Sequence, residues 1–401
     1  MPHIVIFPVY IDLPDGTRFS SISGVRPARH PGAVNLLRHC WTPFPVGVSY
    51  QDPMSPSSHY IPALDGLRAG SILLVWLSHA WLGHLVPGGL GVTVFFFISG
   101  YIITRLMLRE YGATGTLDIR AFYVRRFLRL MPALCVFVLI GSIVLACVEG
   151  RVPLLDLAAA LFYFSNYWTI GGHFMDGTLI SPFSITWSLA VEEHYYLVFP
   201  WLFVMLAPRG AWLARTVLAL IGAVLLWRFA LVALNGPDIL VSRRLYMGTD
   251  TRVDSILYGA IFALLAHARP GLIGRLAGPV PFFVGFSLLL FTLIYRDAFF
   301  REVIRYSVQG VALACMFAYL VFGRGVLTRF LSSAPMTYIG RISYSLYLYH
   351  WLVFVMVDAW MGGSPLWARM AVMAAGSWTA AHLSWRYVES AGTRLRGMLL
   401  G

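Results

Sequence analysis

Residues 60–81 read YIPALDGLRAGSILLVWLSHAW, a hydrophobic run that contains one arginine, Arg68, and one histidine, His79. A helix over this run separates Arg68 from His79 by about 16 Å along its axis, at ~1.5 Å per residue. If Arg68 lies at a membrane interface, His79 lies near the middle of a hydrocarbon core about 30 Å thick. An ionisable side chain at that depth is costly, so we predict that His79 is functional.

The chemistry that suits this histidine is proton transfer near neutral pH. Burial favours the neutral imidazole, which can accept a proton from a hydroxyl group. We therefore propose His79 as a general base. His84, five residues further on, falls near the outer end of the run, where we expect an interfacial role instead.

The composition predicts a membrane protein. Hydrophobic residues make up 58% of the 401 residues and charged residues only 12%. A soluble chain cannot bury so much apolar surface, so we predict a polytopic protein in a lipid bilayer. The net charge of +12 comes from arginine alone, because the chain has no lysine; this excludes Schiff-base chemistry. The arginines lie between apolar runs, which favours a role in membrane orientation over binding of nucleic acid.

The four cysteines form no Cys-x-x-Cys pair. The sequence therefore supports neither a disulfide framework nor a zinc site, and we expect no bound metal.

The first residues differ in character from the rest. Residues 1–57 mix prolines with polar residues, have no helical period and lack the basic start of a signal peptide, so we expect an irregular tail. Met54 opens a short polar leader and is an alternative start, in which case residues 1–53 are not translated. We assign residues 58–390 to one membrane domain and residues 391–401 to a short C-terminal tail.

Ten hydrophobic segments predict an all-α fold with about ten transmembrane helices around a polar cavity that contains His79. A weaker apolar segment, residues 154–168, ends in aromatic and polar residues, and we expect it to lie at the interface or to re-enter the membrane. The ten segments are 68–86, 91–108, 131–149, 188–206, 212–234, 253–268, 280–295, 306–322, 341–360 and 366–386.

Arginine distribution predicts the orientation. Six arginines, the first near the end of the second segment and the others before the third, favour a cytoplasmic position for the loop between these segments. With ten spans both termini are then cytoplasmic, and Arg68 lies at the cytoplasmic edge of the first helix. Two loops predicted on the opposite side, 235–252 and 296–305, run against this bias with three arginines each. The six arginines of the first loop are Arg105, Arg109, Arg120, Arg125, Arg126 and Arg129.

The basic stretch FYVRRFLRLMP, residues 122–132, has two readings. Arg125, Arg126 and Arg129 have helical spacing, with Arg125 and Arg129 on one face. They either mark topology or bind phosphate, since guanidinium groups pair well with phosphate oxygens. We expect Pro132 to open the third span, where a first turn tolerates proline.

Three further groups of residues lie at the start of predicted spans or within them. Glu192 and Glu193 either interact with the helix dipole or direct one carboxylate into a polar cavity. Arg252 and Asp254 form either a stabilising ion pair or a substrate contact. The aromatic run with Tyr344, Tyr347, Tyr349 and His350 either packs or lines the cavity.

Six segments, in this order, resemble the acyltransferase-3 family of integral membrane O-acyltransferases. In the first of them, His79 follows eleven residues after the arginine. The segments are LDGLRA at 64–69, GVTVFFFISGY at 91–101, FYVRRFLRLMP at 122–132, WSLAVEEHYY at 187–196, RVDSILYGA at 252–260 and SYSLYLYHW at 343–351. The resemblance covers roughly residues 58–390. It implies transfer of an acyl group from acyl-CoA, most often acetyl-CoA, to a hydroxyl of a surface polysaccharide, a lipid-linked sugar or a macrolide-type metabolite in the bacterial plasma membrane.

The resemblance also assigns roles. It implies that His79, Arg68 and Glu192 are catalytic, that Arg125, Arg126 and Arg129 bind acyl-CoA, and that no cofactor is bound permanently, because acyl-CoA is a co-substrate. Arg68 either holds a CoA phosphate or orients a carboxylate of the cavity. The remaining matched blocks suggest contacts to the substrate from Trp187, Ser188, Arg252, Asp254, Tyr344 and His350.

The sequence departs from the family pattern in two places. Glu389 is followed by Ser390 where the family often has proline, and no esterase-like domain follows the last span, so we expect the membrane domain to complete the transfer. A direct transfer and an acyl-enzyme both stay open.

The rival function is a transporter of a glycan precursor with His79 as a proton relay; the lack of an internal repeat counts against it. An inactive scaffold is disfavoured because Arg68 and His79 are both present.

Overall fold

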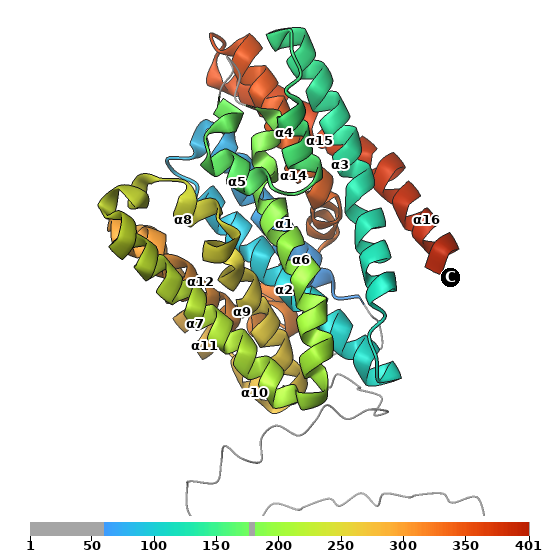
Figure 1. The fold of residues 1–401 in the computed structure, drawn as a ribbon, viewed down its shortest axis with the longest axis vertical. Coiled ribbons are helices and arrows are strands. Elements are labelled where there is room, and N and C mark those ends of the chain that lie inside the picture. Colours follow the sequence, from blue (N-terminus) through green and yellow to red (C-terminus); the bar gives the residue numbers. More distant parts are fainter. Residues whose placement is uncertain (1–59, 176–180, 401) are drawn as a thin grey trace, which may run out of the picture. The chain divides into compact units, whose positions relative to one another are not determined.

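A computed structural model of the chain describes residues 60–175 and 181–400. The expected N-terminal tail and the alternative start at Met54 lie outside the described residues. Every regular element in the described part is helical (Figure 1), so the predicted all-α class is confirmed.

The elements follow one another as α1 Pro62–Leu77, η1 Ser78–Leu82, α2 Gly88–Thr114, α3 Ile119–Glu149, α4 Leu154–Leu161, α5 Ser165–Ile170, η2 His173–Met175, η3 Pro182–Thr186, α6 Trp187–Leu206, η4 Ala207–Arg209, α7 Gly210–Asn235, η5 Pro237–Val241, α8 Arg244–Met247, α9 Thr249–Ala268, α10 Pro270–Leu276, α11 Pro279–Ile294, η6 Phe300–Ile304, α12 Arg305–Phe322, α13 Val326–Leu331, α14 Ala334–Met361, α15 Leu366–Leu383, η7 Ser384–Glu389 and α16 Ser390–Leu400.

Each of the ten predicted spans overlaps one of the longer helices. By length and composition, however, only five helical stretches of the described chain can cross a membrane, or six if the stretch Arg244–Ala268 and α10, bent by 117°, count together. One of the five, Pro182–Asn235, contains two predicted spans. Two others of the ten, α1 and α11, have 16 residues each, about 24 Å at ~1.5 Å per residue. The protein is therefore a membrane protein with five to six candidate spans, and the count of ten stays a prediction.

The segment 154–168 does not form one long helix. It contains α4, of eight residues, and the start of α5, of six residues, separated by a break. At ~1.5 Å per residue, α4 is about 12 Å long, too short to cross a membrane. Tyr163 in the break has a φ of 58°, in the left-handed region.

The third predicted span begins earlier than expected. Pro132 does not open it, because α3 starts at Ile119 and contains Pro132 in its interior. The basic stretch and the apolar span thus form one continuous helix, with Asp118 as its N-cap accepting a hydrogen bond from Ala121 N at 2.8 Å. Proline leaves the carbonyl of Leu128 without its helical donor. Gly392 of α16 packs against this carbonyl, and Figure 1 shows α16 beside α3.

Helices α2 and α9 pack at backbone distance through two glycines. A Cβ atom on Gly100 would lie 1.9 Å from the carbonyl oxygen of Ile256, and one on Gly259 would lie 1.9 Å from that of Phe97. Small residues at such crossings are typical of helix pairs in membranes. Both glycines belong to sequence blocks singled out above, so part of that pattern is explained by packing.

Helix α1 packs against α2 and α14. A hydrogen bond from Trp76 Nε1 to Ser377 Oγ, 2.9 Å long, joins α1 to α15. These contacts hold the end of α1, where His79 follows, against the middle of α14.

Candidate functional site

The helical path changes directly after α1. The π-helical turn Ser78–Leu82 contains His79, and Trp81 in this turn has a φ of 61°. Such a conformation costs free energy for a residue with a side chain and persists only when its surroundings enforce it. Asp358 accepts a hydrogen bond from Trp81 Nε1 at 3.2 Å, and Arg369, which also pairs with Asp358, lies 4.0 Å from the Trp81 ring. The side chains of Asp358 and Arg369 thus fix the break next to His79.

His79 contacts His350 of α14. The Nδ1 atom of His79 lies 3.0 Å from Nε2 of the fully buried His350, and Nδ1 of His350 lies 3.0 Å from the carbonyl oxygen of Leu346. A carbonyl can only accept, so His350 donates through Nδ1 and its Nε2 is an acceptor in the neutral ring. His79 therefore donates through Nδ1. The Nε2 atom of neutral His79 then carries a free lone pair, the form that accepts a proton.

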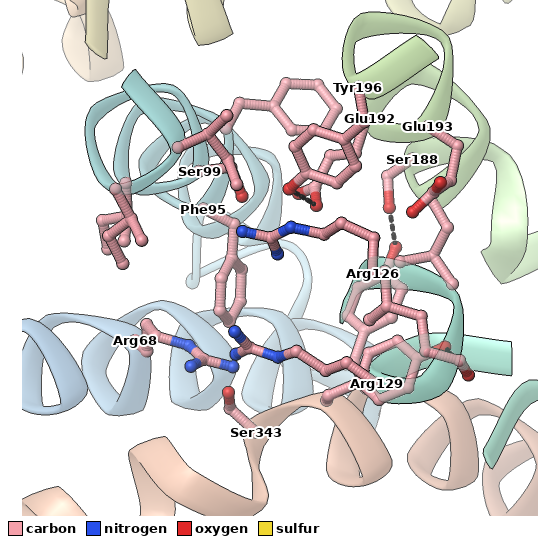
Figure 2. A pocket seen from close by; sticks show the side chains of 18 of the residues that line it. Arg68, Phe95, Ser99, Arg126, Arg129, Ser188, Glu192, Glu193, Tyr196 and Ser343 are labelled. Atoms are coloured by element: carbon pink, nitrogen blue, oxygen red, sulfur yellow. Dashed lines mark hydrogen bonds between the residues drawn. The ribbon is translucent and has the colours of Figure 1, made fainter. Parts of the chain in front are cut away.

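Several predicted site residues meet in one cavity, which we call the Arg68 pocket (Figure 2). It holds about 890 Å³ of empty space, including the open space at its mouth. Side chains from α1, α2, α3, α6 and α14 line it. The predicted residues among them are Arg68, Arg126, Arg129, Ser188, Glu192 and Tyr344.

The three arginines of this pocket are neutralised only in part. Figure 2 shows the guanidinium groups of Arg68 and Arg129 facing each other. Arg68 has one carboxylate at 3.9 Å, that of Asp65, whereas in residues 60–175 and 181–400 no ion pair involves Arg126 or Arg129. The Arg126 guanidinium lies 4.9 Å from the Tyr196 ring centre. Like charges that face each other favour an anion between them, so the pocket is suited to phosphate.

Arg125 lies outside the Arg68 pocket. Its guanidinium forms an ion pair with Glu110 at 2.9 Å, and both side chains are partly exposed. The pair that shares a face toward the pocket is Arg126 and Arg129, three residues apart.

The carboxylates of both Glu192 and Glu193 line the pocket, whereas the sequence suggested that only one of them points into a cavity. Glu192 accepts a hydrogen bond from Tyr196 at 3.0 Å. Glu193 lies on the same wall (Figure 2). The acidic side of the cavity therefore faces its three arginines.

The wall of the pocket reaches the histidine pair through Tyr347. The Tyr347 hydroxyl donates to the Ile185 carbonyl at 3.0 Å and accepts from Ser188 Oγ at 2.6 Å, and its ring centre lies 5.7 Å from that of His350. Tyr344 donates to the Leu130 carbonyl at 3.0 Å, which ties α14 to α3. His79 itself is not among the lining residues.

Several lining residues were not singled out from the sequence, among them Phe95, Ser99, Tyr163 and Ser343. Each of these residues belongs to a sequence feature that could have identified it. The two serines are small polar residues in apolar spans, Phe95 belongs to the aromatic run of the second span, and Tyr163 belongs to the aromatic run expected to re-enter the membrane.

A second cavity, which we call the Arg301 pocket, lies past the C-terminal end of α1 and holds about 1890 Å³, including open space. Ser78, the residue before His79, lines it together with His84, Tyr246 and Tyr306. Hence one neighbour of the histidine pair, Tyr347, lines the Arg68 pocket and another, Ser78, lines the Arg301 pocket.

Arg252 and Trp187 lie between residues of the two cavities and line neither. Arg252 is fully buried, with its guanidinium 3.8 Å from the ring centre of Tyr306, which lines the Arg301 pocket, and 5.7 Å from that of Phe96, which lines the Arg68 pocket. It donates to Thr93 Oγ1 at 3.1 Å. The Trp187 ring lies 4.9 Å from that of Tyr246. Arg252 and Trp187 thus form part of a partition.

Asp254 forms a buried ion pair, but with an arginine that the sequence analysis did not consider. Arg228 of α7 donates to Asp254 at 2.7 Å, and both side chains are fully buried. Arg228 also donates to the Thr251 carbonyl and to Ser307 Oγ, each at 2.7 Å. This network joins α7, α9 and α12 and leaves Asp254 away from either pocket.

Comparison with known proteins identifies the family. A family model described as an acyltransferase domain matches residues 61–385. The chain belongs to the acyltransferase-3 family. The resemblance seen in the six sequence blocks is thereby confirmed.

Two relatives in Staphylococcus aureus, strains NCTC 8325 / PS 47 and COL, are both named O-acetyltransferase OatA. Each is 32% identical to this chain over 356 residues, which cover 83% of it and 57% of the relative. The chain thus matches little more than half the length of these relatives. No solved structure matches it.

Proposed function

We propose that the protein is a membrane O-acyltransferase that moves an acyl group, in particular acetyl, from acyl-CoA to a hydroxyl of a surface polysaccharide, a lipid-linked sugar or a macrolide-type metabolite. Family membership supports the reaction class. The observation that carries the mechanism is the hydrogen-bond chain from His79 through His350 to Leu346.

In this mechanism Nε2 of His79 takes the proton of the acceptor hydroxyl as its oxygen attacks the thioester carbonyl. The carbon–sulfur bond breaks, and the CoA thiolate receives the proton from the imidazolium. His350 holds Nδ1–H of His79 throughout, so the proton enters and leaves at one nitrogen. No acyl-enzyme is required.

The Arg68 pocket is the proposed donor site. Arg68, Arg126 and Arg129 contact the phosphates of CoA, and the pantetheine arm extends along α1 toward His79. Arg68 and His79 are eleven residues apart, about 16 Å if both follow the helical rise, so the phosphates and the thioester occupy opposite ends of one path. In the bacterial plasma membrane this pocket would open to the cytoplasm, where acyl-CoA is made.

Binding and transfer can be tested separately. Purified protein in detergent is titrated with acetyl-CoA, and transfer of labelled acetyl is then measured to a panel of glycans and hydroxylated metabolites. We expect wild type to bind and transfer, and His79→Gln to bind without transfer. Movement of a labelled glycan into proteoliposomes, without acetyl-CoA binding, would instead establish the transporter.

A further inference from the structure

The Arg301 pocket is strongly basic. Four arginines line it, and Glu302 is the single carboxylate among its lining residues in the described chain. The arginines are Arg243, Arg296, Arg301 and Arg305. This excess of positive charge lies on the side of α1 beyond His79, away from the basic donor pocket.

The same four arginines resolve an anomaly in the orientation of the chain. The loops 235–252 and 296–305 carry six arginines although both are predicted to be non-cytoplasmic, where arginine is disfavoured. Two of the six lie outside the Arg301 pocket: Arg244 donates to Asp250 at 2.9 Å, and Arg252 is buried in the partition. The other four all line the Arg301 pocket. Their presence on the side where arginine is disfavoured therefore indicates a shared role in this pocket.

Protein groups neutralise this charge only in part. Glu302 lies 3.8 Å from Arg305 and accepts a hydrogen bond from Tyr306 at 3.3 Å. The Nε atom of Arg305 is buried without a hydrogen-bond partner. In the described residues no ion pair involves Arg243, Arg296 or Arg301. At least three guanidinium groups therefore keep donors free for an anion.

The position of the pocket relates it to the proposed chemistry. Ser78 lines it one residue before His79, and the partition with Arg252 and Trp187 separates it from the donor pocket. A ligand held there therefore lies next to Ser78, the chain neighbour of His79.

We propose that the Arg301 pocket is the acceptor site and that it binds an anionic group, a carboxylate or a phosphate, of the hydroxylated acceptor. This inference rests on the proposed acyltransferase function. It restricts the acceptor class to acidic sugars or sugar phosphates, with the anion held by the arginines and the reacting hydroxyl directed to His79.

The test uses purified full-length protein in a neutral detergent, without acyl-CoA. Three probes, glucose 1-phosphate, methyl glucuronide and methyl glucoside, are titrated by calorimetry at constant ionic strength. We expect the neutral glucoside to bind at least roughly tenfold more weakly than one or both anionic probes, the difference expected from a charge-assisted hydrogen bond. The tighter anionic probe identifies the carboxylate or the phosphate as the preferred group. Equal binding of all three would overturn the proposal.

The double variant Arg301→Gln/Arg305→Gln should weaken the anionic probes by roughly tenfold or more while acetyl-CoA binding stays at the wild-type level, which also shows that the variant is folded. Arg301→Lys should retain more binding, because it keeps the charge. Arg275→Gln, at an exposed arginine that lines neither pocket, is the matched control and should have no effect.

Two results would contradict this assignment. Loss of probe binding in Arg126→Gln/Arg129→Gln, but not in the Arg301 variants, would mean that the probes occupy the donor pocket. Displacement of glucose 1-phosphate by phosphatidylglycerol in nanodiscs would assign the Arg301 pocket to a membrane lipid.

Because the probes are measured without acyl-CoA, absence of acyl transfer would refute the proposed function while leaving anion binding intact. Undiminished transfer by the Arg301 variants would refute only the acceptor site.

Discussion

His79 and His350 are 271 positions apart in the chain, yet Nδ1 of one lies 3.0 Å from Nε2 of the other. The Leu346 carbonyl at the far end of this chain of hydrogen bonds fixes which nitrogen of each ring carries a proton. Helix α14 thus orients the histidine at the end of α1 and sets its tautomer. This relationship between an ionisable group and its orienting partner is what general-base catalysis requires.

Replacing His79 is the direct test of the base. Both His79→Ala and His79→Gln should lower kcat by roughly 10²–10⁴-fold, because neither side chain accepts a proton at neutral pH. The KM for acetyl-CoA should stay close to wild type, since His79 is not among the residues of the Arg68 pocket. Steady-state kinetics with varied donor separates the two parameters.

His84→Ala is the control on the same segment. His84 is exposed and does not contact His350, so its loss should leave kcat nearly unchanged. Because His84 lines the Arg301 pocket, any effect should appear in the KM for the acceptor. A His79→Gln enzyme with normal turnover would exclude the proposed mechanism.

His350 should act by positioning His79. In His350→Phe the Nδ1–H of His79 loses its acceptor, worth about 1–3 kcal/mol, so we expect kcat to fall roughly ten- to hundredfold. His350→Gln places an amide oxygen near the former Nε2 and should recover part of this loss. If His350 merely fills space, phenylalanine should be tolerated better than glutamine, and the order of the two kcat values decides.

The donor pocket predicts a contrast between neighbouring arginines. Arg126→Gln and Arg129→Gln should each raise the Kd for acetyl-CoA roughly ten- to hundredfold, as for loss of a hydrogen bond to a charged group. Arg125→Gln should change it little, because Arg125 pairs with Glu110 outside the pocket. Equal effects of all three variants would indicate a general effect of charge instead. Equilibrium binding to purified protein measures this without a known acceptor.

Topology can be tested by cysteine labelling in a cysteine-free background. Thr116, in the exposed turn between α2 and α3, should be cytoplasmic, and Asp238, exposed in η5, should be on the opposite side. Asp238→Cys should therefore react with an impermeant maleimide in intact cells, and Thr116→Cys only after permeabilisation. The reverse pattern would invert the model and place the Arg68 pocket away from cytoplasmic acyl-CoA.

Part of the Arg68 pocket could be predicted from the sequence, because the segments that resemble the family contain Arg68, Arg126, Arg129 and Glu192, and all four line the cavity. The helical spacing of the basic stretch singled out its three arginines. It did not separate Arg125 from Arg126, because adjacent residues differ by about 100° around a helix, and the face that packs is set by tertiary contacts.

The remainder depends on contacts between distant segments. Arg228 lies in an apolar span and carries the same signal as His79, but its partner Asp254 is 26 residues away and was paired by sequence with nearby Arg252. The left-handed Trp81 is fixed by Asp358 and Arg369, which no local pattern connects to it. Similarly, the Arg301 pocket assembles from loops whose arginines, taken singly, only weakened the predicted orientation.

The crossing of α2 and α9 gives a prediction about stability. Gly100→Ala and Gly259→Ala each place a methyl group 1.9 Å from a backbone carbonyl oxygen, so the helices must separate. Overpacking of this kind costs about 1–3 kcal/mol, and we expect a lower melting temperature in detergent for both variants. Gly112→Ala, on α2 with nothing within 4 Å of the added carbon, is the matched control and should be neutral or slightly stabilising, because alanine favours a helix interior. If all three variants melted together, the close crossing would be wrong. If the two crossing variants melted early but retained acetyl-CoA binding at low temperature, the glycines would be needed for packing alone and not for donor binding.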